Sequence, residues 1–166
     1  MERLEVGDSD YEWEIHRYRY WVAAHFVRAG DVVLDAACGI GYGRHTLPEG
    51  ITWIGVDRRP PEGAREVDLR TWVADLDYDV FIGLETIEHI DGSLDPYVGN
   101  AKRAKRAIVI STPIIPTIHF NEFHKRDFTP ASLEALFVDD VWRVAHYETQ
   151  VNNVYGIWAF TRREAS

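Results

Sequence analysis

The chain of 166 residues contains a single cysteine, Cys38, and a single methionine. One cysteine rules out a disulfide framework within the chain, which fits a reducing compartment and predicts a cytoplasmic protein. Long apolar runs are also missing, because none approaches the roughly 18 residues of a membrane span. The first residues, Met-Glu-Arg-Leu-Glu-Val, lack the pattern of a signal peptide. We therefore expect neither membrane insertion nor secretion.

Positive charge is scarce as well. The 18 lysines and arginines are outnumbered by 27 aspartates and glutamates, which gives a net charge of -9. Neutralising a phosphate backbone needs basic residues in excess, so general nucleic-acid binding is not expected. The sequence has no repeats, low-complexity tracts or linkers, and 46% of it is hydrophobic. These features predict a single domain over 1–166 with a substantial core.

Apolar runs alternate with helical patterns along the chain. We predict helices and strands at 11–29 (helix), 32–36, 52–56, 65–69, 78–84, 93–104 (helix), 107–111, 131–137 (helix), 141–149 and 153–161. This order indicates an α/β, three-layer, Rossmann-like fold with a mostly parallel seven-stranded sheet and a late antiparallel strand.

The connections between the first three predicted strands are short. Only about eight residues separate the second strand from the third, fewer than a crossover helix needs. We therefore expect truncated helices there and one thinly covered sheet face. A homodimer is a simple way to cover such a face, although the aromatic helix at 11–29 is another.

The segment 31–43 has the most distinctive pattern. An apolar run ends at Asp35, and Gly39, Gly41 and Gly43 follow on alternate positions. Glycines allow a backbone to approach a ligand closely. The dinucleotide-binding pattern G-x-G-x-x-G fails, because Arg44 stands where its third glycine belongs. A carboxylate before the loop also favours a cationic or hydroxyl-bearing ligand, so a nicotinamide dehydrogenase is disfavoured.

Two acids follow at the ends of later predicted strands. Asp57 ends the strand after the glycine loop, and an acid there can accept hydrogen bonds from both hydroxyls of a ribose. Asp68 ends the next strand and could accept the amino group of an adenine. The alternative for both is an ordinary solvated acid at a strand end.

The arrangement D-x-A-x-G-x-G resembles the first motif of class I S-adenosylmethionine-dependent methyltransferases, in particular the small type-11/type-23 group. Further matching pieces are His16 to Tyr20, Gly55 to Asp57, Tyr78 to Val80, Glu85 to His89, Ile110 to Pro113, Asn121 to His124, Phe128 to Pro130, and Gln150. Two features depart from the family pattern. The helix after the second strand is largely missing, and Ala-Lys-Arg-Ala-Lys-Arg at 101–106 replaces a Pro-Gly-Gly turn.

The resemblance implies S-adenosylmethionine as cofactor and S-adenosylhomocysteine as product. It assigns Asp35 and Gly39 to Gly41 to the methionine part, Asp57 to the ribose, and Asp68 with Leu69 to the adenine. The full implied cofactor set is Tyr18, Asp35, Ala36, Gly39, Ile40, Gly41, Asp57, Arg58, Asp68, Leu69 and Glu85.

Three histidines are candidates for contact with an acceptor. His89 follows the fourth predicted strand and could deprotonate or orient a hydroxyl, because imidazole titrates near neutrality. The alternative is that Glu88 and His89 only tie this turn into the fold. His119 and His124 lie in the segment 112–128, which suits a lid over the substrate, although surface or core histidines are the default. A metal site is not expected, because the spacing is scattered.

These features predict methyl transfer to a small molecule, a sugar or a glycan, with oxygen favoured slightly over nitrogen as the acceptor. Leu-Glu-Thr-Ile at 84–87 lacks the Asn/Asp-Pro-Pro-aromatic motif that methylases of nucleic-acid amino groups share. Cytosine carbon methylation needs a cysteine nucleophile, and Cys38 lies in the glycine loop. The alternative function is a catalytically silent S-adenosylmethionine-binding partner subunit.

Overall fold

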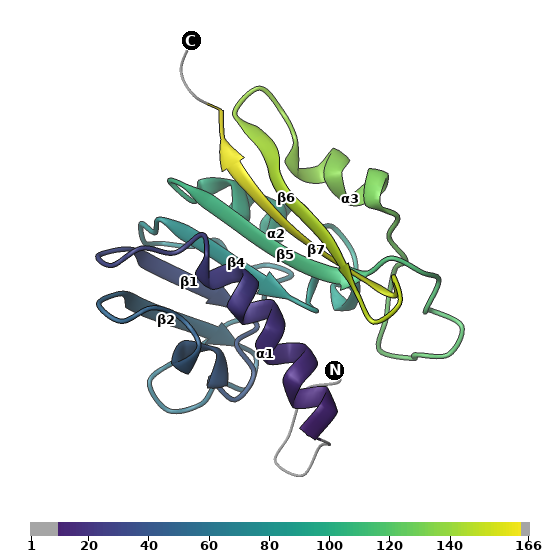
Figure 1. Ribbon diagram of the computed structural model, residues 1–166, viewed down its shortest axis with the longest axis horizontal. Helices are drawn as coiled ribbons and strands as arrows, with labels where there is room; N and C mark the ends of the chain where they lie inside the picture. The colour runs from purple at the N-terminus through teal and green to yellow at the C-terminus, as the bar shows by residue number, and fades with distance from the viewer. Residues whose placement is uncertain (1–9, 164–166) are drawn as a thin grey trace.

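The computed structural model describes residues 10–163, which form one seven-stranded sheet with helices on both faces (Figure 1). In chain order the elements are α1 (Asp10–Ala24), β1 (Val32–Ala36), the 3-10 helix η1 (Tyr42–His45), β2 (Thr52–Asp57), β3 (Arg65–Glu66), β4 (Val80–Leu84), the 3-10 helix η2 (Ile87–His89), α2 (Asp95–Arg103), β5 (Ala107–Pro113), α3 (Pro130–Phe137), β6 (Trp142–Gln150) and β7 (Tyr155–Arg162). Within these residues, no helix is long and apolar enough to cross a membrane.

The strands lie in the order β3-β2-β1-β4-β5-β7-β6. Strands β1 to β5 pair in parallel, whereas β7 is antiparallel to both β5 and β6. The strand order reverses between β1 and β4, and ligands of open α/β sheets bind at the carboxyl ends of strands beside such a switch point. The predicted Rossmann-like fold with a late antiparallel strand is confirmed.

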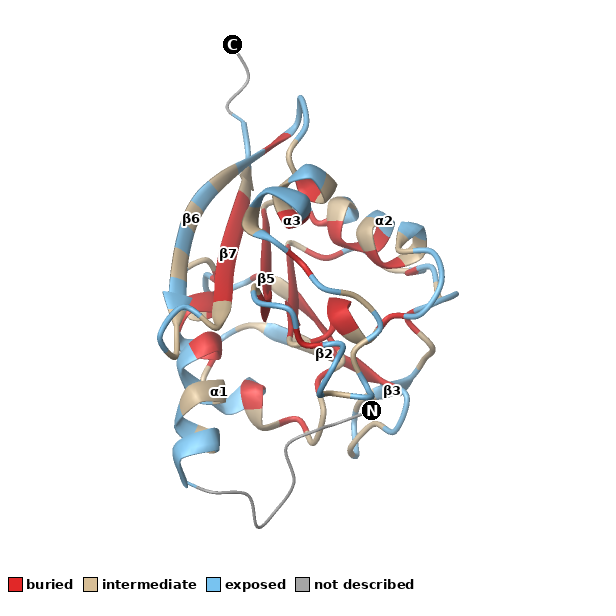
Figure 2. Ribbon diagram, turned by 90° about the vertical axis from the view of Figure 1, so that its right-hand side faces the viewer, coloured by how far each residue is buried: buried red, intermediate tan, exposed pale blue. Residues whose placement is uncertain are grey.

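Each face of the sheet has its own hydrophobic core. On one face, Tyr20, Ala23 and Val27 pack against inward-facing residues of β1, β4 and β5. On the other, α2 and α3 contribute residues such as Tyr97 and Leu133 to a larger core. Figure 2 shows the buried central strands with α1 on one side and α2 and α3 on the other. The two cores make the three layers of the fold.

The connections between the first three strands are short, as predicted. Only η1 lies between β1 and β2, and the described chain has no helix between β2 and β3. Strand β3 is shorter than the predicted 65–69, because it pairs only with β2, which ends at Asp57 opposite Glu66. Helix α1 ends before residue 29, because His25, Phe26 and Val27 donate to carbonyls three residues back.

Helix α1 is fixed against the glycine loop by the side chain of Tyr20. A Cβ atom on Gly43 would overlap the Tyr20 ring. We expect Gly43→Ala to lower the free energy of unfolding by about 1–3 kcal/mol, the usual cost of overpacking. Gly99 in α2 is the control, because a Cβ there meets open space and alanine should add about 0.5–1 kcal/mol. Urea denaturation of both variants checks this, and equal stabilities would contradict it.

Candidate functional site

Two adjoining hollows of about 230 and 360 Å³ open at the carboxyl ends of β1, β2 and β4. Ala37, Asp57 and His89 line both, so the two hollows form one site. Each has the size of a small-molecule subsite, and together they match the volume of an ordinary ligand pocket. The site lies beside the switch point between β1 and β4.

The structure brings together most of the residues that the sequence singled out. The residues that line the two hollows are Gly39, Asp57, Arg58, Asp68, Leu69, Glu85, His89 and His124. The residues that do not line either hollow are Tyr18, Asp35, Ala36, Ile40, Gly41 and His119. Tyr18 faces Glu148, and the hydrogen bond between them raises the pKa of the Tyr18 hydroxyl. His119 is exposed in the segment 112–128, which we call the lid.

Asp57 joins the end of β2 to the glycine loop. Its Oδ2 accepts the backbone N–H of Gly39 at 3.0 Å, and its Oδ1 accepts that of Arg59 at 2.9 Å. A carboxylate has about four acceptor sites, so these two bonds leave capacity for two ligand hydroxyls. Gly39 has φ +59 and no atom within 4 Å of a Cβ position, so its backbone faces open space. A ligand can therefore approach both groups closely.

Asp35 is occupied by contacts within the chain. The Tyr20 hydroxyl donates to its Oδ1 at 3.0 Å, and the Trp53 indole N–H donates to its Oδ2 at 3.0 Å. Only 1% of Asp35 is exposed, and this burial raises the pKa of its carboxyl to about 6. Asp35 therefore ties α1 and β2 to the base of the glycine loop, one layer below the open cavity.

The raised pKa of Asp35 predicts a pH dependence of stability. The folded carboxyl binds its proton more tightly than the unfolded one, so the stability that it contributes is complete below about pH 4 and is lost as pH rises through about 6. A pKa difference of about 2 corresponds to about 3 kcal/mol. Asparagine does not titrate, so only the wild type loses this stability as pH rises. We therefore expect the free energy of unfolding of Asp35→Asn, relative to that of the wild type, to rise by about 3 kcal/mol between pH 4 and 7. Urea denaturation across this range tests it, and parallel pH profiles would contradict it.

Arg19 is a site residue that the sequence analysis did not single out. It is 1% exposed on α1, and its guanidinium lies 3.7 Å from Glu85 Oε2. The guanidinium also donates to Gln150 Oε1 at 2.9 Å and lies 4.4 Å from the centre of the Tyr155 ring. Arg19 thus connects α1, the end of β4 and the β6–β7 hairpin. The Arg19–Glu85 pair faces the larger hollow.

Two residues of the site have strained backbones. Ala37 after β1 has φ 61, and Glu85 after β4 has φ 49. Non-glycine residues in this left-handed region cost on the order of 1–3 kcal/mol and concentrate at functional sites. The Glu85 conformation is held by its own backbone N–H, which donates to the Ser111 carbonyl and hydroxyl, and by Ser111 Oγ, which donates to Glu85 Oε1 at 2.8 Å.

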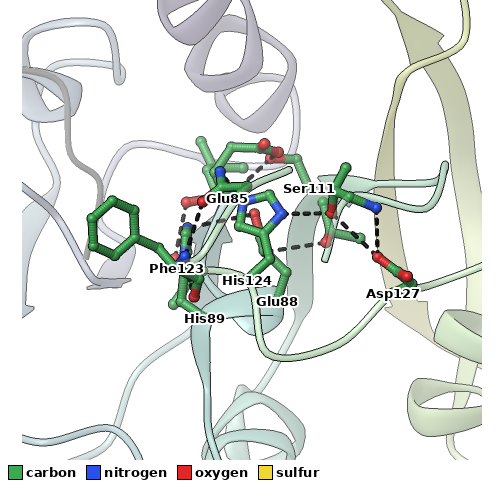
Figure 3. A network of polar contacts seen from close by, with 12 residues as sticks. Glu85, Glu88, His89, Ser111, Phe123, His124 and Asp127 are labelled. Atoms are coloured by element: carbon green, nitrogen blue, oxygen red, sulfur yellow. Dashed lines mark hydrogen bonds and ion pairs between the residues drawn. The ribbon is translucent and has the colours of Figure 1, made fainter. Parts of the chain in front are cut away.

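Two histidines that are far apart in the sequence meet at the rim of the larger hollow. His89 ends η2 and His124 belongs to the lid, and their ring centroids lie 4.7 Å apart in an edge-to-face arrangement. Figure 3 shows both histidines beside Glu88, with Glu85 close by. Their spacing in the sequence gave no sign of this contact, because the lid folds back over η2.

No protein-family model and no curated protein matches the sequence. Solved structures do resemble it. Magnesium protoporphyrin IX methyltransferase from Synechocystis, with bound S-adenosylhomocysteine, has a TM-score of 0.69 and 15% identity over 96% of this chain and 90% of that one. A complex of the Haloferax volcanii Trm112 methyltransferase activator with a methyltransferase gives 0.73 and 13%, over 92% and 90%.

The same fold also occurs in the (4+2)-cyclase SpnF, with a TM-score of 0.74 and 10% identity over 97% of this chain and 85% of that one. At these identities the similarity concerns the arrangement of the backbone. The chain has the fold of the class I S-adenosylmethionine-dependent methyltransferases.

Proposed function

We propose that this protein is an S-adenosylmethionine-dependent methyltransferase that acts on a small molecule, a sugar or a glycan, with an oxygen acceptor slightly favoured over nitrogen. The observation that carries the proposal is the pairing of Asp57 with Gly39 in a cavity at the sheet's switch point. This pairing presents a carboxylate with spare acceptor sites next to open backbone.

The residues around the cavity fit the parts of this cofactor. Asp57 would hold the ribose hydroxyls, and Asp68 with Leu69 would border the adenine in the smaller hollow. Gly39 and Arg19 would border the methionine part in the larger hollow, where the buried guanidinium suits a carboxylate. When bound, the cofactor supplies an activated methyl group.

The contribution of the protein is then mainly positioning. Holding a donor and an acceptor aligned at near-attack distance can lower a barrier by roughly 7–11 kcal/mol. The acceptor site would lie between η2 and the lid, where His89 and His124 line the larger hollow. His89 donates its Nδ1–H to the Phe123 carbonyl at 3.1 Å, because a carbonyl oxygen can only accept. Its Nε2 is therefore the nitrogen that would act at the acceptor, either as a base or as a ligand of a cation that binds the acceptor.

A methyl-transfer assay tests this function. The protein is incubated with S-adenosylmethionine and separate panels of hydroxylated small molecules, glycans and amines, and S-adenosylhomocysteine is quantified by mass spectrometry. We expect turnover with at least one oxygen acceptor above the level without acceptor. Asp57→Ala is the matched negative control. Cofactor binding without turnover on any panel would contradict catalysis and favour a silent subunit.

The alternative function, a silent cofactor-binding partner subunit, has one supporting observation in the structure. The edge strand β3 is only two residues long, and both Arg65 and Glu66 are exposed. The Haloferax structure similarly pairs a protein of this fold with an activator chain.

Homodimerisation through the thinly covered side of the sheet also stays a prediction. Light scattering at high micromolar concentration tests it, and a uniform monomer would contradict it.

A further inference from the structure

One carboxylate and two imidazoles converge at the rim of the larger hollow. Glu88 and His89 belong to η2, directly after β4, and His124 comes from the lid. One ligand atom of each residue lies within 4.8 Å of the others. The three residues come from two separate segments, so their convergence results from the fold and not from sequence proximity (Figure 3).

Hydrogen bonds outside this cluster fix both rings in orientations that suit metal ligands. His89 donates its Nδ1–H to the Phe123 carbonyl, and His124 Nδ1 lies 2.6 Å from Thr117 Oγ1. Thr117 Oγ1 in turn donates to Asp127 Oδ1 at 3.2 Å. Histidines that bind metals almost always donate their other ring N–H to such a partner.

The protonation of His124 follows from its neighbour Asn121. The Phe123 backbone N–H donates to Asn121 Oδ1 at 3.0 Å, which fixes the orientation of the amide. The Asn121 amide nitrogen therefore lies 3.0 Å from His124 Nε2, which accepts from it. His124 is thus a neutral ring with its proton on Nδ1, the form in which Nε2 can bind a cation.

Glu88 supplies a buried carboxyl group at the cluster. It is 1% exposed, and its Oε2 accepts from Thr112 at 3.1 Å. Its Oε1 has no hydrogen-bond partner among residues 10–163 and lies 3.9 Å from His89 Nε2. A buried oxygen without a partner requires an explanation. The buried guanidinium of Arg19 contacts Glu85.

We propose that Glu88 Oε1, His89 Nε2 and His124 Nε2 bind one divalent cation of the first transition series. Two imidazoles and one carboxylate suit Zn²⁺, Fe²⁺ or Mn²⁺. With only three protein ligands, the cation keeps coordination positions open for solvent or substrate. Ligands at roughly 2.1 Å in a tetrahedral site lie about 3.4 Å apart. Binding therefore requires the three ligand atoms to approach one another and releases Nε2 of His124 from Asn121.

The cation also gives the acceptor site its chemistry, a step that rests on the proposed methyl transfer. A hydroxyl bound to a divalent cation loses its proton to solvent more readily. Its oxygen would then bond to the methyl carbon as the carbon–sulfur bond breaks, which releases S-adenosylhomocysteine. The open coordination positions would face the larger hollow, which the cluster lines. The acceptor class is then an alcohol, a phenol or a sugar that can present an oxygen to the metal, which agrees with the preference for oxygen.

Calorimetric titration of the chelator-treated full chain with Zn²⁺ and with Mn²⁺, without cofactor or acceptor, tests the site. We expect one cation per chain and at least tenfold weaker binding in both Glu88→Gln and His124→Gln. Glu88→Gln removes the charge with little change of shape. His45→Ala is the matched control, because His45 is exposed in η1 outside the cluster. Its affinity should equal that of the wild type.

Thermal melts of each variant show that the protein is folded before titration. Absence of binding in the wild type, or wild-type affinity in both folded cluster variants, would overturn the proposal. Because neither S-adenosylmethionine nor an acceptor is present, this failure would leave the proposed methyl transfer standing. Conversely, failure to bind the cofactor would leave the cation titration unaffected.

Discussion

Replacing Arg19 with alanine is expected to lower the free energy of unfolding by about 3–5 kcal/mol, the usual cost of removing one partner of a buried ion pair. Arg19 and Glu85 are both largely shielded from water, with side-chain exposures of 1% and 13%. Without the guanidinium, Glu85 stays buried beside Glu88, and the α1 contacts to Gln150 and Tyr155 are lost as well.

Urea denaturation at neutral pH measures this effect. Arg17→Ala is the matched control on the same helix, because Arg17 is exposed and its removal should change stability by less than about 0.5 kcal/mol. The double variant Arg19→Ala with Glu85→Gln should be more stable than Arg19→Ala alone, because it no longer leaves a buried charge uncompensated. A loss below about 1 kcal/mol for Arg19→Ala would show that the pair is not buried as described.

Asp57→Ala is expected to weaken binding of S-adenosylhomocysteine at least tenfold. Charge-assisted hydrogen bonds to the ribose contribute about 1.5–3 kcal/mol, and 1.4 kcal/mol corresponds to a factor of ten. The substitution also removes the carboxylate that accepts a hydrogen bond from the Gly39 N–H, which loosens the glycine loop. Asp77→Ala is the control, because Asp77 is exposed and does not line the cavity. Equal affinities by calorimetry would place the ribose contact elsewhere.

Much of the fold could be predicted from the sequence, because parallel strands that are buried on both faces are continuous apolar runs. Val80 to Leu84 is buried at every position and bounded by polar residues, so its pattern was plain. Strand β3 was predicted too long, since its length depends on where β2 ends and not on its own residues. The glycine loop was recognisable because its backbone path requires glycine at specific positions.

The site was harder to predict, because its side chains are paired across the fold. Asp35 is predicted to contact the cofactor, and the structure adds that Tyr20 and Trp53 both donate to it, partners that no local pattern reveals. The scattered spacing of His89 and His124 argued against a metal cluster, whereas the lid brings the two rings together. The sequence around Glu88 and His89 left a catalytic and a structural role open, and only the fold shows which residues face this turn.

Calorimetric titration of the wild-type chain with S-adenosylhomocysteine and with NAD, side by side, tests whether the cavity binds S-adenosylmethionine. The pairing of Asp57 with Gly39, and Arg44 in place of a third glycine, predict saturable one-to-one binding of S-adenosylhomocysteine and none of NAD. Binding of NAD, or no binding of S-adenosylhomocysteine by the folded protein, would contradict this assignment of the cavity.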